Sequence, residues 1–599
     1  MLQELRDSGI RLGIISNIGQ ETEEDVRRLL EGARLYDFFE PDLLIYGAKD
    51  SPEIFRRAAE RAGHSAAPEH CVYIGEDRDE RTYALEAGFR VAPHPRLALQ
   101  VLNGKHLRYV RVTVPADENG SGGWRGAIRR LPVVPIHVTG ESGTTVYAVA
   151  TSDAASRLDD LGFEVLRLGS EDLPLGTEVY LLRDDRQTRT GFLVEEGESS
   201  RFFDSDEESQ LVLASSEGGL YVALPAGRSV EQYHFEEALH GHNLKLSPGV
   251  VLLEPTQVTR TANLLSAPPV ESVLNQEEIE ALRSEITPES IAADVDRYGG
   301  KKPVDDAGAI TIKSRHIQHE HNALAVKALR QDLKRIGGDD FLVALHQFTH
   351  EGRDLDNVEA ELVGSELEEI VLITAHLDST AAFTPPLGSY NPPKDPAPGV
   401  DDDGSGTVAV LAAARAIKRL SAIKQPKRTI RFVLFNAEEH GLAGSKAYAG
   451  NEATQETSIV AVYQMDMIGF NREPPRTYEV HSGIRQHPDV EKGSRVLAER
   501  IGRLAEHVSP DLLAPEIYDS KGPEQNGDPA ERRSDHYSFQ VVGYPACLAS
   551  EDLFPGVNIP GTSDSNPNYH RVTDTEVDTE YAADIARAVA AAAWTTANL

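Results

Sequence analysis

The chain has 599 residues, more than the roughly 250 to 300 that one hydrophobic core usually holds, so several domains are expected. Its composition of 40% hydrophobic and 26% charged residues excludes wholesale disorder. The net charge of -36 repels phosphate and argues against a nucleic-acid partner. Only two cysteines are present, Cys71 and Cys547, which excludes a disulfide framework and a cysteine-rich zinc module. Any bound metal must therefore be held by histidines and carboxylates.

The sequence contains no candidate membrane span. No stretch approaches about 18 consecutive apolar residues, and the first residues, MLQELRDSGIRLGIISN, carry acids where a signal peptide has a basic and then an apolar run. We therefore expect no membrane partner and a cytoplasmic location, with export left open if the chain starts further upstream.

Residues 1–103 alternate amphipathic helical segments with short apolar runs such as IRLGIIS, PDLLIYG and CVYIGE. This alternation predicts a partial Rossmann-like α/β unit with parallel strands and crossover helices. Residues 104–255 change to strand-like runs such as YVRVTVPA and GLYVALPAG, with one helix predicted at SDAASRLDDLG. This pattern indicates a mostly β middle domain, whose role the sequence does not reveal.

Residues 256–309 are polar with short helical signals, NQEEIEALRSEI and the capping pattern TPES, and are predicted to form a linker or lead-in helices. Residues 310–599 form a long α/β stretch with helices after Thr407 and at the C-terminus. Because its strands are apolar on both faces, we expect an α/β/α sandwich with a mostly parallel central sheet. The predicted strands are 357–363, 369–375, 429–435, 459–465 and 544–550.

Polar residues directly follow the apolar strands of this last stretch, which is where open α/β sheets place their sites. Two histidines, two aspartates and one glutamate suit two divalent metals, with one carboxylate bridging them and an adjacent glutamate left as a base. Two zinc ions about 3.5 to 4 Å apart can share one water, lower its pKa and polarise an amide carbonyl. The residues concerned are His376, Asp378, Asp401 to Asp403, Glu438, Glu439, Asp466 and His570.

The strings AHLDST, APGVDDDGSG, FNAEEHGLAGS, MDMIG, SDHYSF, GYPA and NYHRVTDT occur in this order over residues 310–599. As a set they resemble the two-zinc aminopeptidase family that includes bacterial leucyl aminopeptidase, among the clan MH metallopeptidases. The resemblance implies an aminopeptidase that hydrolyses N-terminal residues from peptides with a free N-terminus. A related single-zinc fold cyclises N-terminal glutamine, and the intact Asp402 and Glu439 favour hydrolysis over that reaction.

The resemblance also implies a role for each matching residue. His376 and Asp466 would bind one zinc, Glu439 and His570 the other, and Asp402 would bridge them. Other divalent metals also suit these ligands. The catalytic residues would be Glu438 as general acid and base and Asp378 as the carboxylate that orients His376. Met467 would line the substrate pocket. One departure concerns that pocket, since some relatives have a cysteine pair before the SDH string and this chain has PAERRSDH.

Other clusters have simpler explanations. Three acids in a loop, or a glutamate pair after a strand, are taken singly more often a solvated turn or a helix N-terminus. Ser534, Asp535 and His536 cannot converge as a catalytic triad, because consecutive residues point to different sides of the chain, so SDH is interpreted as a loop-shaping segment. We expect no metal at two further histidine groups, which are His316, His319 and His321, and His234, His240 and His242.

The N-terminal 103 residues resemble the C-terminal part of a haloacid-dehalogenase-like hydrolase. The resemblance implies a phosphate and magnesium site but not its nucleophile, because no D-x-D motif precedes Gly13, and DSD at 204–206 lies in an acidic loop. Two alternatives to the aminopeptidase therefore stay open, a magnesium-dependent phosphatase and a catalytically silent peptide- or protein-binding protein. The residues implied for the phosphatase are Ser16, Asn17, Lys49, Glu76, Asp77 and Asp79.

Overall fold

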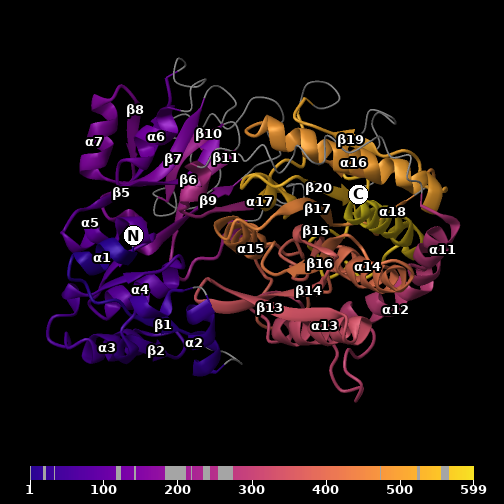
Figure 1. The fold of residues 1–599 in the computed structure, drawn as a ribbon, viewed down its shortest axis with the longest axis horizontal. Helices are drawn as coiled ribbons and strands as arrows, with labels where there is room; N and C mark the ends of the chain where they lie inside the picture. Colours follow the sequence, from indigo (N-terminus) through magenta and orange to yellow (C-terminus); the bar gives the residue numbers. More distant parts are fainter. Residues whose placement is uncertain are drawn as a thin grey trace.

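The computed structural model describes most of the chain in three successive parts, coloured indigo, purple to magenta, and red to yellow in Figure 1. Among the described residues, no helix has both the length and the apolar character needed to cross a membrane. The described residues are 2–17, 22–32, 34–115, 123–139, 144–182, 211–216, 219–233, 243–253, 274–472, 474–521, 527–554 and 566–599.

The N-terminal part alternates helices and short strands, as its sequence pattern indicates. Its strands pair in parallel, but as two separate two-stranded sheets, β1 with β2 and β3 with β4. One continuous Rossmann-like sheet is thus not formed by the described strands, because β1 and β3 both border a cavity. The elements are α1 (Leu2–Asp7), β1 (Ile14–Ser16), α2 (Glu23–Gly32), β2 (Leu44–Tyr46), α3 (Pro52–Arg61), β3 (Val72–Ile74), α4 (Arg78–Glu86), β4 (Arg90–Ala92) and α5 (Ala98–Leu102).

The middle part consists of two antiparallel four-stranded sheets, in the orders β6-β7-β5-β8 and β10-β11-β9-β12. Of its helices, α7 (Ser152–Asp160) was predicted, whereas α6 (Gly123–Arg129) and α8 (Leu173–Gly176) were not. The strands are β5 (Leu107–Thr113), β6 (Val133–Thr139), β7 (Thr145–Thr151), β8 (Glu164–Leu168), β9 (Thr177–Leu182), β10 (Val212–Ser216), β11 (Gly219–Pro225) and β12 (Asn243–Leu246).

Two helices precede the C-terminal part, α11 (Gln276–Glu285) and α12 (Pro288–Tyr298). Asn275 and Thr287 begin them with capping boxes, so the TPES pattern does mark a helix start. The segment was expected to be a linker or lead-in helices, and Leu282, Ile291 and Val295 are buried in the same hydrophobic core as α14 (Gly404–Ile423) and α18 (Thr579–Asn598). These helices therefore belong to the packing of the C-terminal part.

The C-terminal part is built on an eight-stranded sheet of order β13-β14-β16-β15-β17-β20-β18-β19. Its centre, β16-β15-β17-β20, is parallel, while β14 pairs antiparallel with β13 and β16, and β18 antiparallel with β20. The strands are β13 (Phe341–His350), β14 (Arg353–Leu362), β15 (Glu366–His376), β16 (Arg428–Phe435), β17 (Ile459–Met465), β18 (Glu479–His481), β19 (Glu516–Tyr518) and β20 (Ala546–Ser550).

Helices cover both faces of this sheet (Figure 1). Along β15, Val371 and Ile373 join the core under α14 and α18, whereas Ile370 and Leu372 join the core under α15 and α17, as the two-residue period of a strand requires. The helices are α13 (His321–Gly337), α14 (Gly404–Ile423), α15 (Ala443–Thr454), α16 (Pro488–Val508), α17 (His536–Gln540) and α18 (Thr579–Asn598).

Arg78 joins all three parts. Its side chain is 1% exposed, donates hydrogen bonds to the carbonyls of Leu224 and Arg228, and lies 3.4 Å from Glu351 in the turn between β13 and β14. A buried guanidinium with several acceptors stabilises a junction mainly by satisfying groups that would otherwise lose their hydrogen bonds. The contacts of Arg78 therefore fix the N-terminal part to the other two.

We expect Arg78→Ala to destabilise the chain by about 3 to 5 kcal/mol, because it leaves the buried Glu351 carboxylate and two carbonyls without their donor. Denaturant unfolding followed by fluorescence measures this. Arg56→Ala is the matched control, since Arg56 pairs with Glu53 on the exposed surface of the same part and its loss should leave the transition unchanged. Equal effects of the two substitutions would contradict this role of Arg78.

Candidate metal centre

The parallel strands β15, β16 and β17 end at one edge of the sheet, and the predicted residues lie there. His376 is the last residue of β15, Glu438 follows the end of β16 by three residues, and Asp466 directly follows β17. Asp402 precedes α14, and His570 comes from the loop before α18. Because parallel strands present their carboxyl ends together, five distant segments meet in one place.

The imidazoles and carboxylates face one another at short range. His376 Nε2 lies 3.2 Å from Asp402 Oδ1 and 3.4 Å from Asp466 Oδ1. His570 Nε2 lies 3.1 Å from Asp402 Oδ2 and 2.8 Å from Glu439 Oε2. Asp402 thus turns one oxygen to each half of the cluster, which is the placement that a bridging ligand requires.

The three consecutive aspartates have different tasks. Asp403 accepts the backbone N–H groups of His376, Gly406 and Met467, so both of its oxygens are engaged. One of its oxygens also lies within 4.8 Å of a possible ligand atom of His376 and of Asp466. Three backbone donors already satisfy Asp403, so it is less suited than Asp402 to bind a metal ion.

The other neighbour, Asp401, accepts the backbone N–H of Gly469 and the side-chain amide of Asn566. Asp574 in turn accepts the backbone N–H groups of Asp401 and Asp402. The sequence did not predict these supporting roles. The one available signal for Asp574 was its place in the string NYHRVTDT.

Asp378 holds the turn that carries the glutamate pair. Its oxygens accept the backbone N–H groups of Glu438 and Glu439 at 3.0 and 3.3 Å, and Oδ1 lies 3.5 Å from His376 Nδ1. Glu438 Oε2 is 4.0 Å from His376 Nε2. Asp378 therefore touches both the imidazole that it was predicted to orient and the backbone of the predicted base.

The site has the charge and donor set for cations. Its six central side chains, four carboxylates and two imidazoles, are each 6% exposed or less. Nε2 of His376 and Oε1 of both Glu438 and Glu439 are buried without a hydrogen-bond partner in the described structure. Burial raises the pKa of the Glu438 carboxyl well above its ordinary value, opposed by His376 and reinforced by Glu439 and Asp466. Such an excess of buried carboxylate is stable when cations neutralise it, so divalent metals fit these residues.

The SDH segment supports the cluster rather than forming a triad. Ser534 Oγ donates a 2.6 Å hydrogen bond to Asp466 Oδ2, while Asp535 accepts one from the Gln464 amide. Met467 is 1% exposed and packs in an apolar cluster with Leu548 and Phe554. Met467 therefore lies directly after Asp466 and next to apolar side chains, and its place in a substrate pocket stays a prediction.

The histidine groups expected not to bind metal are placed as follows. His316 Nε2 lies 2.9 Å from Glu231, and the rings of His319 and His321 meet edge to face at the start of α13. Possible ligand atoms of His316, His440 and Glu231 also lie within 4.8 Å of one another. His234, His240 and His242 lie outside the described residues.

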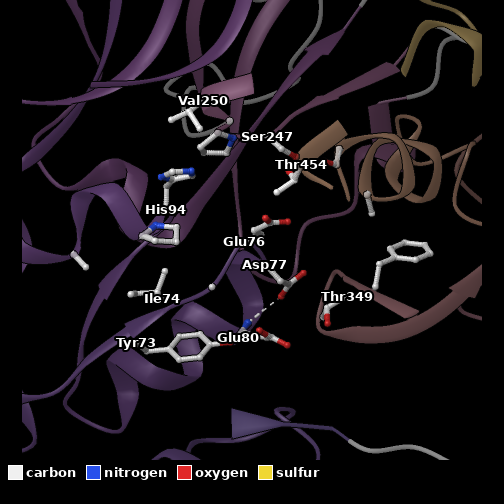
Figure 2. A pocket seen from close by; sticks show the side chains of 18 of the residues that line it. Tyr73, Ile74, Glu76, Asp77, Glu80, His94, Ser247, Val250, Thr349 and Thr454 are labelled. Atoms are coloured by element: carbon white, nitrogen blue, oxygen red, sulfur yellow. Dashed lines mark hydrogen bonds between the residues drawn. The ribbon is translucent and has the colours of Figure 1, made fainter. Parts of the chain in front are cut away.

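Of the residues predicted for the phosphatase, Lys49, Glu76 and Asp77 line a cavity of about 1380 Å³ among all three parts of the chain. Figure 2 shows Glu76, Asp77 and Glu80 beside Tyr73 and Ile74 of β3. Asp77 accepts the backbone N–H groups of Glu80 and Gly352. These contacts hold Asp77 at the junction with the C-terminal part.

The remaining residues of that predicted site are also engaged. Lys49 pairs with Glu80 at 2.6 Å, Asp79 accepts the backbone N–H of Gly227, and Asn17 donates to Asp354. Ser16 Oγ lies 3.4 Å from the carbonyl of Asn17. The DSD string at 204–206 lies outside the described residues.

Comparison with known proteins bears on the C-terminal part. Residues 357–595 match the model of peptidase family M28. Leucine aminopeptidase 1 of Aspergillus fumigatus is 25% identical over 288 residues, covering 47% of this chain and 66% of the relative. The same-named protein of Penicillium rubens is 35% identical over 136 residues, covering 22% and 33%. The chain thus spans less than two thirds of these relatives, and the matches support a metallo-aminopeptidase resemblance for the M28-like part.

Two solved structures are also similar. The LapA aminopeptidase of Legionella pneumophila has 16% identity and a TM-score of 0.45, with 83% of this chain and 99% of that chain covered. BSAP, a zinc aminopeptidase from Bacillus subtilis, has 24% identity and a TM-score of 0.29, with 41% and 50% covered.

Removing the hydroxyl that holds Asp466 should weaken metal binding. We expect Ser534→Ala to lower the affinity of the chain for Zn²⁺ by about 10- to 100-fold, as is usual when a ligand loses its supporting hydrogen bond. Titration of the metal-free chain with Zn²⁺ against a chromophoric chelator measures the change. Ser509→Ala is the control, because Ser509 is equally buried and its hydroxyl donates to the carbonyl of Asp584 in α18. Unchanged affinity in the first variant would show that Ser534 does not support the site.

Proposed function

We propose that the chain is a metal-dependent aminopeptidase that removes N-terminal residues from peptides with two zinc ions. The observation that supports this most is Asp402, whose two oxygens lie 3.2 and 3.1 Å from His376 and His570. The match of residues 357–595 to peptidase family M28 points to the same activity. His376 and Asp466 would hold one ion, Glu439 and His570 the other, with Asp402 between them.

Zinc bound by these residues would supply an acidified water and an electrophile for the amide carbonyl at neutral pH. Glu438 is the residue that moves the proton. It accepts a proton from the attacking water at a carboxylate oxygen and later delivers it to the nitrogen of the departing peptide. Asp378 keeps Glu438 in place through the backbone N–H, so the base need not reorganise during the reaction.

The substrate is a peptide with a free N-terminus. Its first side chain would lie against the apolar cluster of Met467, Leu548, Leu553 and Phe554, and its α-amine would lie beside the acidic ligands. A buried apolar cluster next to several carboxylates suits an apolar residue that carries a positive amine.

No contact in the described structure specifically favours the phosphatase or the silent binding protein. A magnesium phosphatase would need Asp77 and Asp79 for its metal, and these accept the backbone N–H groups of Gly352 and Gly227 in the other two parts. Lys49 is paired with Glu80 within the N-terminal part. A silent binding protein would be favoured by loss of a ligand or of Glu438, and the full set is present. The aminopeptidase remains the proposal.

The base assignment is tested by Glu438→Gln. We expect kcat on leucyl-p-nitroanilide to fall by about 10²- to 10⁴-fold, because the amide can no longer take up the proton, while two metal ions remain bound. Glu499→Gln, at an exposed position of α16, serves as the control and should not alter kcat. A Glu438→Gln chain with near wild-type turnover would show that Glu438 is not the general base.

Chelation should abolish hydrolysis. After dialysis against a chelator, activity should fall to background and return with about two equivalents of Zn²⁺ per chain, because the carboxylate-rich site has no other source of an activated water. Parallel additions of Mn²⁺ and Co²⁺ determine which metals the site accepts. A metal-free chain that keeps full activity would refute the proposed mechanism.

A further inference from the structure

Glu231 of the β-rich middle part reaches into the C-terminal part. It lies in the short 3₁₀ helix Val230–Tyr233, and its side chain is 7% exposed. Both carboxylate oxygens lie 2.9 Å from His316 Nε2, and one accepts the hydroxyl of Thr380. One carboxylate from outside the M28-like part therefore holds two of its loops.

The first loop leads to the metal ligand His570. Thr380 begins a turn whose Phe383 donates its backbone N–H to the carbonyl of His570 at 2.8 Å, with the two rings 5.1 Å apart. Thr384 Oγ1 then accepts the backbone N–H of Val572 at 3.0 Å. Fixing Thr380 thus fixes the backbone on which His570 sits.

The second loop leads to the metal ligand Glu439. The ring of His316 meets the ring of His440 edge to face, with centroids 5.1 Å apart, and His440 directly follows Glu439. The middle part supports the same loop from β12, where Lys245 donates its backbone N–H to the carbonyl of Gly441. Both contacts of Glu231 therefore lead toward the same half of the metal centre.

A metal at Glu231, His316 and His440 is the competing interpretation, since their atoms lie within 4.8 Å of one another. The backbone N–H of Gln318 donates to His316 Nδ1 at 3.0 Å, so the proton of a neutral ring must sit on Nε2. A protonated Nε2 donates to Glu231 and cannot bind a metal ion. The group is thus a hydrogen-bonded pair beside a histidine.

We propose that Glu231 is a positioning residue for the subsite formed by Asp402, Glu439 and His570, and that the β-rich middle part is an integral support of the metal centre. The inference rests on the proposed function only in taking these three residues as metal ligands. Glu231 acts on the ligands through Thr380 and His316. These contacts do not lead to the subsite of His376 and Asp466.

The test is a metal titration of full-length chains without substrate. His376→Ala and His570→Ala identify which of two binding steps belongs to which subsite. Glu231→Ala should weaken the His570 step by 10-fold or more and leave the His376 step within about 3-fold, as expected for loss of a supporting hydrogen bond. Glu231→Gln retains one acceptor oxygen and should recover part of the loss, which keeps the test valid if the alanine variant does not fold.

Glu80→Gln is the matched control, because Glu80 is a buried carboxylate that pairs with Lys49 within the N-terminal part. It should leave both steps unchanged. Unaltered steps in Glu231→Ala, equal weakening of both steps, or a third ion lost with Glu231 would each overturn the inference. A wild-type chain that binds two ions but hydrolyses no peptide would refute the proposed function and leave this inference standing.

Discussion

The excess of carboxylates buried at one sheet edge is the constraint on which the rest of the C-terminal part depends. Asp402, Glu438, Glu439 and Asp466 meet two imidazoles with almost no exposure to solvent. Like charges at this range repel strongly in a low dielectric, so the arrangement requires both cations and rigid support. The support comes largely from hydrogen bonds in which Asp378, Asp403 and Asp574 accept backbone N–H groups of the loops that carry the cluster.

This constraint explains why the site lies where the parallel strands end. Each ligand needs a backbone that does not yield to repulsion, and β15, β16 and β17 supply that as central strands covered by helices on both faces. The α14 helix adds a second fixed point, because Asp403 caps its first turn while Asp402 turns its two oxygens to His376 and His570. The order of strand, acidic loop and helix is thus the means by which five remote residues hold one geometry.

The sequence predicted the elements whose burial and periodicity are strong. All five expected strands of the C-terminal part are present, and the predicted ligands lie together at their ends. It did not predict β13, whose sequence FLVALHQFTH mixes polar and apolar residues because the strand lies at an edge. The sequence also did not predict the separate sheets of the N-terminal part, or that Asp403 and Asp574 accept backbone N–H groups around the site. Those roles depend on backbone donors from distant loops, which no local pattern records.

Buried polar groups with hydrogen-bond partners also hold the three parts of the chain together. The string GEDRDE, which resembles a phosphatase motif, places Asp77 on the backbone of Gly352 and buries Arg78 against the middle part. Buried polar groups must find partners, and in a chain of several parts those partners lie on a neighbour. Glu231 follows that rule, except that its partners belong to loops that lead to the proposed metal ligands Glu439 and His570. A β-rich part packed against an α/β part can therefore influence its chemistry without touching substrate, because the repelling carboxylates keep their geometry only as firmly as the loops that hold them.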